Sequence, residues 1–203
     1  MSGECMKREK RAVSWFGKLP CVGDFCSNNM SEPLLNALDL WLSAAMQNGH
    51  EKHGAAWTNA YYQAPMHGFL LGGKALPALS GQSAVGVIMP SVDKAGRAFP
   101  FVLMEQLDSA LTTRPNHEEL ARWFLQAHTL CASALDEEWT LKRFGDALDL
   151  LPELQSTHAL TTEDTDSHWY RLEFSGSVQW LTRYQGLPDI SAFETLFGLN
   201  TAP

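Results

Sequence analysis

Two apolar segments are separated by a connector rich in turn-forming and charged residues, and this feature most limits how the chain can fold. The connector, Met89–Pro100, reads MPSVDKAGRAFP. The flanking segments, 84–88 and 98–104, are apolar at odd and even positions alike, which is typical of strands covered on both faces. We therefore expect a tight β–β connection between two central strands. It would expose four side chains, Ser91, Asp93, Lys94 and Arg97.

The rest of the chain alternates between strand-like and helix-like patterns. Period-two or apolar runs predict strands at 12–16, 67–71, 168–174 and 177–184. Helical spacing and capping residues predict helices at 31–49, 55–63, 116–135, 140–151 and 191–197. A polar loop is expected at 156–167. These elements predict an α+β fold, an α/β sandwich whose central mixed, largely antiparallel sheet has helices packed on its faces.

Composition predicts one folded domain. Hydrophobic residues make up 45% of the 203 residues and charged residues 19%, which is typical of a globular protein. Residues 1–11 are basic and without periodicity, so we expect a mobile tail before a single domain at 12–203.

The net charge of −8 is unevenly distributed. Residues 136–173 carry ten Asp or Glu against three Lys or Arg. This balance argues against nucleic acid as a partner, and fits either a basic protein partner or a solvated acidic surface.

Neither a membrane segment nor a metal site is expected. No apolar run approaches the roughly 20 residues that cross a bilayer, so a cytoplasmic location without membrane insertion is expected. Cys5, Cys21, Cys26 and Cys131 lack the paired spacing of a zinc site or a disulfide framework. We expect no cofactor.

Two interpretations fit the polar residues. Asp24, Asp93 and Arg97, with His67 nearby, could form the acid/base or phosphoryl-binding site of a hydrolase or related enzyme. Alternatively, both aspartates bond backbone amides in their own turns, while Arg97 pairs with a carboxylate and fastens two loops together. Neither an activated serine, a Cys/His pair nor a metal motif is present, so we favour the second interpretation and assign no catalytic residue.

Several motifs, in this order, resemble the TagF family of type VI secretion-associated proteins, also called ImpM-like. They are WFGKLP at 15–20, GDF at 23–25, LxxWL at 38–42, MPSVDxxGRxFP at 89–100, WY at 169–170 and the segment 186–197. We take the residues of the two main motifs as structural or partner-binding candidates: Gly17, Lys18, Pro20, Gly23, Asp24, Phe25, Pro90, Ser91, Asp93, Gly96, Arg97 and Pro100.

The resemblance implies a function as well as a fold. It implies a cytoplasmic accessory protein of the bacterial type VI secretion system. Such a protein would repress assembly or firing after translation by binding a forkhead-associated scaffold protein. Members of the family are not known as enzymes, so protein–protein binding is the expected activity, and an enzyme with an Asp/Arg site is the alternative.

Overall fold

A seven-stranded sheet lies at the centre of the computed structural model, which describes residues 13–107, 117–136, 138–152, 154, 165–173 and 175–199. The strands, in the order in which they pair, are β2 (Cys26–Asn28), β1 (Val13–Gly17), β5 (Phe101–Gln106), β4 (Ala84–Met89), β3 (Met66–Leu71), β6 (Asp166–Leu172) and β7 (Val178–Gln185). Every pairing among these strands is antiparallel.

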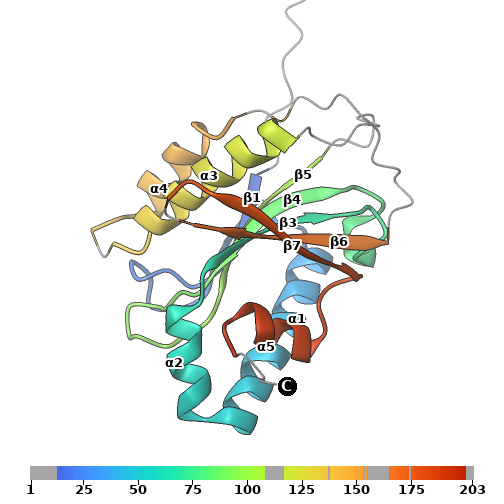
Figure 1. Ribbon diagram of the computed structural model, residues 1–203. Coiled ribbons are helices and arrows are strands. Elements are labelled where there is room, and N and C mark those ends of the chain that lie inside the picture. The colour runs from blue at the N-terminus through green and yellow to red at the C-terminus, as the bar shows by residue number, and fades with distance from the viewer. Residues whose placement is uncertain are drawn as a thin grey trace, which may run out of the picture.

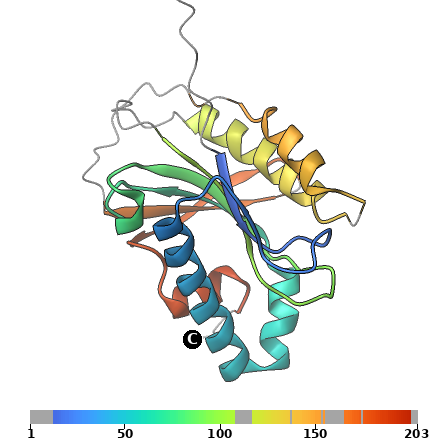
Figure 2. The ribbon, with the colours of Figure 1, turned by 180° about the vertical axis from the view of Figure 1, so that it is seen from behind.

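Helices cover both faces of the sheet (Figures 1 and 2). One face carries α3 (His117–Ser133) and α4 (Leu141–Leu148), and the other carries α1 (Glu32–His53), α2 (Ala55–Gln63) and α5 (Ile190–Leu196). A short 3-10 helix, η1 (Pro77–Leu79), leads into β4. Two separate hydrophobic clusters fill the space between the layers. The expected α+β architecture is therefore confirmed.

The two central strands explain why the sequence around the connector is continuously apolar. Successive side chains of a strand point to opposite faces. Accordingly Val85 and Val87 of β4 join the cluster beneath α3, whereas Ile88 joins the cluster beneath α1. β4 and β5 pair from Ala84 to Met89, so the expected β–β connection is confirmed.

The helix expected at 31–49 continues to His53. Gly49 does not end it, because this glycine is a packing site. A Cβ atom at Gly49 would lie 2.6 Å from ring atoms of Trp57 in α2. The glycine therefore lets two successive helices approach closely, and α1 ends only at Gly54.

Other differences from the expected elements lie near the sheet edges. The expected loop at 156–167 ends earlier, because Asp166 and Ser167 already belong to β6. Ser167 is fully buried, and its hydroxyl accepts a hydrogen bond from the indole of Trp169 at 2.9 Å. The short edge strand β2 was not predicted, since its sequence is mostly polar. The expected basic tail at 1–11, the first residue of the helix expected at 116–135 and the loop residues 156–164 lie outside the described residues.

A buried carboxylate fastens the last helix to the first. Glu194 of α5 is fully buried and accepts hydrogen bonds from Asn48 (2.7 Å), Lys52 (3.0 Å) and His53 (3.2 Å) of α1. Burial alone would raise the pKa of Glu194, but the bonds from Lys52 and His53 hold it below its usual value. The C-terminal segment is thus an integral part of the layer formed by α1 and α2. Within the described part of the chain, no helix is long and apolar enough to cross a membrane.

Substituting two helical glycines should have opposite effects on stability. Ala at Gly49 would push against the Trp57 ring, and we expect G49A to lower the free energy of unfolding by about 1 to 3 kcal/mol. Gly145 of α4 has open space around its missing Cβ, so G145A should raise stability by roughly 0.5 to 1 kcal/mol through helix propensity. Urea unfolding of the two variants checks this. Equal shifts of the same sign would contradict the packing role of Gly49.

Candidate functional site

Two loops that are far apart in sequence lie side by side at one end of the sheet (Figures 1 and 2). They are the first loop, Lys18–Phe25, and the connector. Three hydrogen bonds join them: Ser91 Oγ to the Lys18 carbonyl (2.6 Å), Lys94 N to the Val22 carbonyl (2.7 Å) and Arg97 Nη2 to the Gly23 carbonyl (2.7 Å). The two motifs that the sequence separates thus form one structural unit.

A buried ion pair lies at the centre of this unit. Lys18 Nζ is 3.0 Å from Asp93 Oδ2, and the side chains are only 8% and 0% exposed. Arg97 Nε also donates to Oδ2, at 2.7 Å. The other oxygen, Oδ1, accepts from the backbone amides of Ala95 (2.9 Å) and Arg97 (3.0 Å). Both carboxylate oxygens are therefore occupied by protein donors.

This arrangement keeps Asp93 ionised. Burial by itself would raise the pKa of Asp93, but hydrogen bonds to its carboxylate hold the pKa well below the usual range. The donors are the amide of Arg97, the side chains of Lys18 and Arg97, and the amide of Ala95. Asp93 is then a fixed negative charge that organises the turn and holds the first loop.

Two side chains that the sequence led us to expect on the surface are buried. Ser91 is 4% exposed and Asp93 is 1% exposed. The cause is the docking of the first loop and of α2 on the connector. Tyr61 Oη of α2 accepts from Ser91 N at 2.8 Å and donates to the Ser91 carbonyl at 2.9 Å. Burial raises the pKa of Tyr61, so this phenol stays protonated and keeps its donor role.

Phe25 closes the outer side of the ion pair. Its ring stacks on Phe16 (centroids 5.8 Å apart) and meets Phe99 edge-on (4.7 Å), although 46% of its surface stays exposed. The Lys18 ammonium lies 5.0 Å from the centre of this ring, within the range of a cation–π interaction. Phe25 therefore shields Lys18 while presenting an aromatic surface to the outside.

Two glycines of the two motifs lie at backbone positions that a residue with a side chain could not occupy without strain or collision. Gly17 has a φ of +136°, and a Cβ there would collide with the backbone of Pro100 and Phe101 on β5. Gly96 has a φ of +77°, which the turn after Asp93 requires. Pro20 and Pro90 line a cavity beside the connector.

The residues of the alternative enzyme site are only partly brought together. Asp93 and Arg97 pair, but the Asp24 carboxylate accepts a bond from the neighbouring Phe25 amide at 2.8 Å, and Arg97 reaches the Gly23 carbonyl instead. His67 does not join them. It lies in β3 with its ring 6.2 Å from that of Phe197, and neither ring nitrogen has a hydrogen-bond partner among the described residues.

Sequence reasoning missed two contacts that hold this unit, the pairing of Lys18 with Asp93 and the bonds of Tyr61 to Ser91. Lys18 was a candidate, but its pairing with Asp93 was not foreseen; a lone cation inside the apolar run WFGKLP is the signal that could have found it. No pattern in the sequence marks Tyr61 as the partner of Ser91. Among the described residues, no group of three or more His, Cys, Asp or Glu side chains could hold a metal ion.

Removing the charge of Asp93 should destabilise the protein through Lys18. Asn in place of Asp93 can still accept the two amide bonds, but it leaves the Lys18 ammonium buried without a counter-charge. We expect D93N to lower the thermal midpoint by about 5 to 10 °C. The double variant K18M/D93N should recover part of that loss. A circular-dichroism melt measures both.

The matched control is K94A, because Lys94 is the exposed neighbour in the same turn and should leave the melt unchanged. Since the folded-state pKa of Asp93 is lowered, its stabilisation is present above the unfolded pKa of about 3.9 and is lost as the pH falls further. The D93N effect should therefore be constant between pH 5 and pH 8. An effect that disappears at pH 6 would argue against an ionised Asp93.

His67 should make stability depend on pH. Burial, and then the charge of Arg171, lower the pKa of His67 to about 4. Below its unfolded pKa of about 6.5, the unfolded chain binds a proton that the folded protein excludes. As the pH falls from 7 to 4, this residue should lower the free energy of unfolding by about 3 kcal/mol. In H67F, denaturant unfolding should show a shallower pH dependence; equal slopes in both proteins would contradict a buried neutral imidazole.

Comparison with known proteins places these loops in a family. Residues 14–151, from β1 through α4, match the family described as TagF N-terminal domain, type VI secretion system-associated. The crystal structure of PA0076 from Pseudomonas aeruginosa PAO1 is similar, with a TM-score of 0.74 and 27% sequence identity over 94% of this chain and 96% of that chain. No curated protein matches the chain. The first loop and the connector both fall inside the matched region, and the chain belongs to the TagF N-terminal domain family of type VI secretion system-associated proteins.

Proposed function

We propose that this protein is a regulatory accessory protein of the type VI secretion system, acting in the cytoplasm by binding other proteins. The observation that carries the proposal is the family match over residues 14–151, which contains both joined loops. In this proposal the protein represses assembly or firing of the apparatus after translation, and its partner is a forkhead-associated scaffold protein.

The geometry of the joined loops supports binding over catalysis. Both carboxylate oxygens of Asp93 accept hydrogen bonds from protein donors, and the Ser91 hydroxyl donates a hydrogen bond to the Lys18 carbonyl. These polar groups hold the loops in place, and Phe25 and Lys94 are among the exposed side chains that the loops present to a partner. Preorganised loops of this kind lower the entropic cost of association.

Deleting the gene in the native bacterium tests the proposal. Loss of a repressor should increase the amount of type VI effector in the culture medium, and re-expression of the protein should reverse the increase. Immunoblots of the medium and of cell pellets, with a cytoplasmic marker to exclude lysis, give the measurement. Unchanged secretion would contradict a regulatory role, and decreased secretion would indicate a protein that assists the apparatus.

The binding surface is tested separately with charge-reversal variants of purified protein. K94E changes an exposed cation on the connector, whereas R122E changes an exposed cation on α3, away from the two loops. If the loops form the interface, K94E should weaken capture of the forkhead-associated scaffold by roughly threefold to tenfold, and R122E should not. Equal capture by both variants would remove the loops from the interface.

A further inference from the structure

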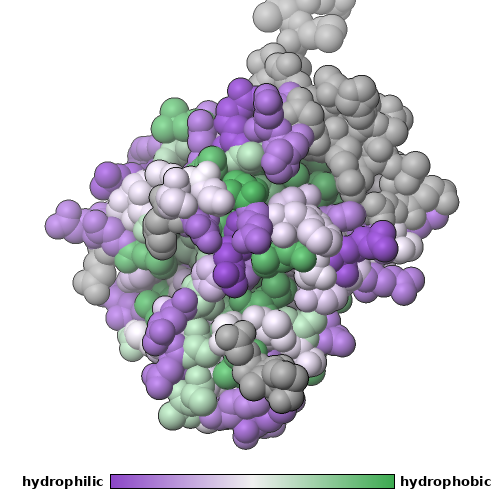
Figure 3. All heavy atoms as spheres, in the orientation of Figure 1, coloured by the Kyte–Doolittle hydropathy of each residue, from purple (hydrophilic) through white to green (hydrophobic). Residues whose placement is uncertain are grey.

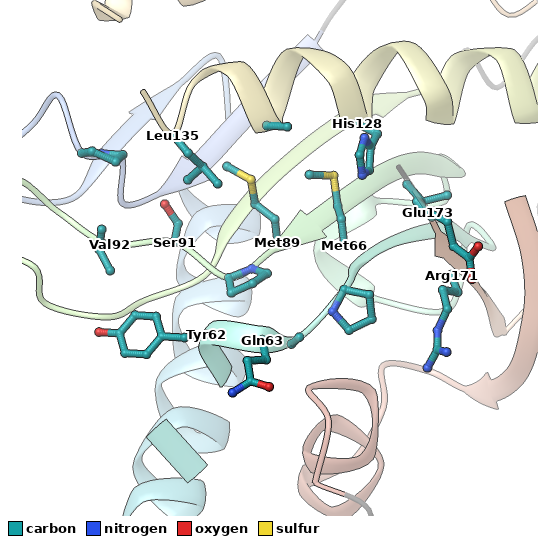
Figure 4. Close-up of a pocket in the computed structure, with 16 residues that line it drawn as sticks. Tyr62, Gln63, Met66, Met89, Ser91, Val92, His128, Leu135, Arg171 and Glu173 are labelled. Atoms are coloured by element: carbon teal, nitrogen blue, oxygen red, sulfur yellow. The ribbon is translucent and has the colours of Figure 1, made fainter. Parts of the chain in front are cut away.

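A groove of about 730 Å³ opens beside the joined loops. Its walls are the C-terminal half of α3, the end of α2 with the segment after it, Pro20 of the first loop, the start of the connector, and the end of β6 (Figure 4). This volume is within the range of sites that take a ligand of drug size or a few peptide side chains.

The floor of the groove is apolar and adaptable. Met66 and Met89 lie at its centre in Figure 4, and Leu172 also lines the groove. Two large apolar side chains stand on its rim, Leu135 at 40% exposure and Tyr62 at 52%. In the middle of the face shown in Figure 3, hydrophobic areas lie beside hydrophilic ones. Methionine side chains repack easily, which suits a floor that receives apolar side chains of varied shape.

One end of the groove carries two exposed charged side chains, Arg171 and Glu173. Arg171 forms no ion pair with any residue that the structure describes. The Glu173 carboxylate accepts a hydrogen bond from Ser175 Oγ at 3.3 Å. Across the strand, Arg171 is opposite His67 rather than a carboxylate. An apolar channel that ends at a guanidinium without an ion pair among the described residues is complementary to an apolar segment bearing a carboxylate.

We propose that this groove binds a short amphipathic segment of a partner protein, which inserts apolar side chains over Met66 and Met89 and places a carboxylate at Arg171. The inference rests on the proposed function in one respect: the partner is taken to be another type VI secretion component. The occupant is an acidic amphipathic peptide, and neither a basic segment nor a small metabolite has the same complementarity.

The groove and the joined loops share a wall. Pro20, Pro90, Ser91 and Val92 line the groove, and Ser91 is held by the Lys18 carbonyl and by Tyr61. The buried ion pair of Lys18 and Asp93 therefore fixes the shape of the binding surface without touching the ligand.

The experiment uses the purified 203-residue chain and an array of overlapping peptides that covers the type VI secretion proteins encoded in the same genome. Bound peptides should share apolar residues on one face and an Asp or Glu, and their affinities are then measured by fluorescence anisotropy. L135D should weaken binding by about tenfold or more, and R171A by about threefold to tenfold. E173Q removes the competing carboxylate and should strengthen binding.

The matched control is L40D, because Leu40 is a leucine 73% exposed on α1, outside the groove. L40D should bind the peptides as the unmodified protein does, and unchanged thermal midpoints exclude unfolding of any variant. The proposal is overturned if no peptide binds, if bound peptides are enriched in Lys or Arg, or if L135D and L40D behave alike. Such results would not change the secretion phenotype expected of the deletion strain. Failure of the groove proposal is therefore distinguishable from failure of the proposed function.

Discussion

The carboxylate of Asp93 is a charge held inside the protein, and it can be buried only after two distant segments meet. Its partners come from the first loop, through Lys18, and from its own turn, through the amides of Ala95 and Arg97. An isolated ion in this position would cost several kcal/mol of desolvation, so the pair is formed only when β1 and β5 are correctly aligned. The ion pair thus ties the strand register of the sheet to the conformation of the loops at its end. Both motifs of the sequence are explained by this one requirement.

Local patterns predicted the sheet well where each strand is covered on both faces. The continuous apolar runs of β4 and β5, the stripe from Leu120 to Cys131 on α3, and α2 at Ala55–Gln63 are properties of short stretches. The α+β architecture followed from their order along the chain, because alternating strands and helices have few ways to pack in layers.

What the sequence did not reveal depends on contacts between distant residues. Gly49 reads as a helix terminator, and only the position of Trp57 shows that it is a packing site. The same holds for Ser91 and Asp93, which look like surface residues of a turn until the first loop and Tyr61 cover them. The groove at Met66 and Met89 has no sequence signature, since five separate segments build its walls.

The pairing of β3 with β6 has a consequence for how the protein can be divided. The family match ends at residue 151, yet β6 pairs with β3 from Met66 to Leu71, and every residue of β3 is buried. A protein cut at 151 would leave this apolar strand as an open sheet edge, which other chains can extend by backbone pairing. The 203-residue chain ends the sheet with β7 instead. Every residue of this strand is partly or fully exposed, and its pairing with β6 contains a bulge. The C-terminal segment therefore protects the molecule against self-association, whatever its role in partner binding.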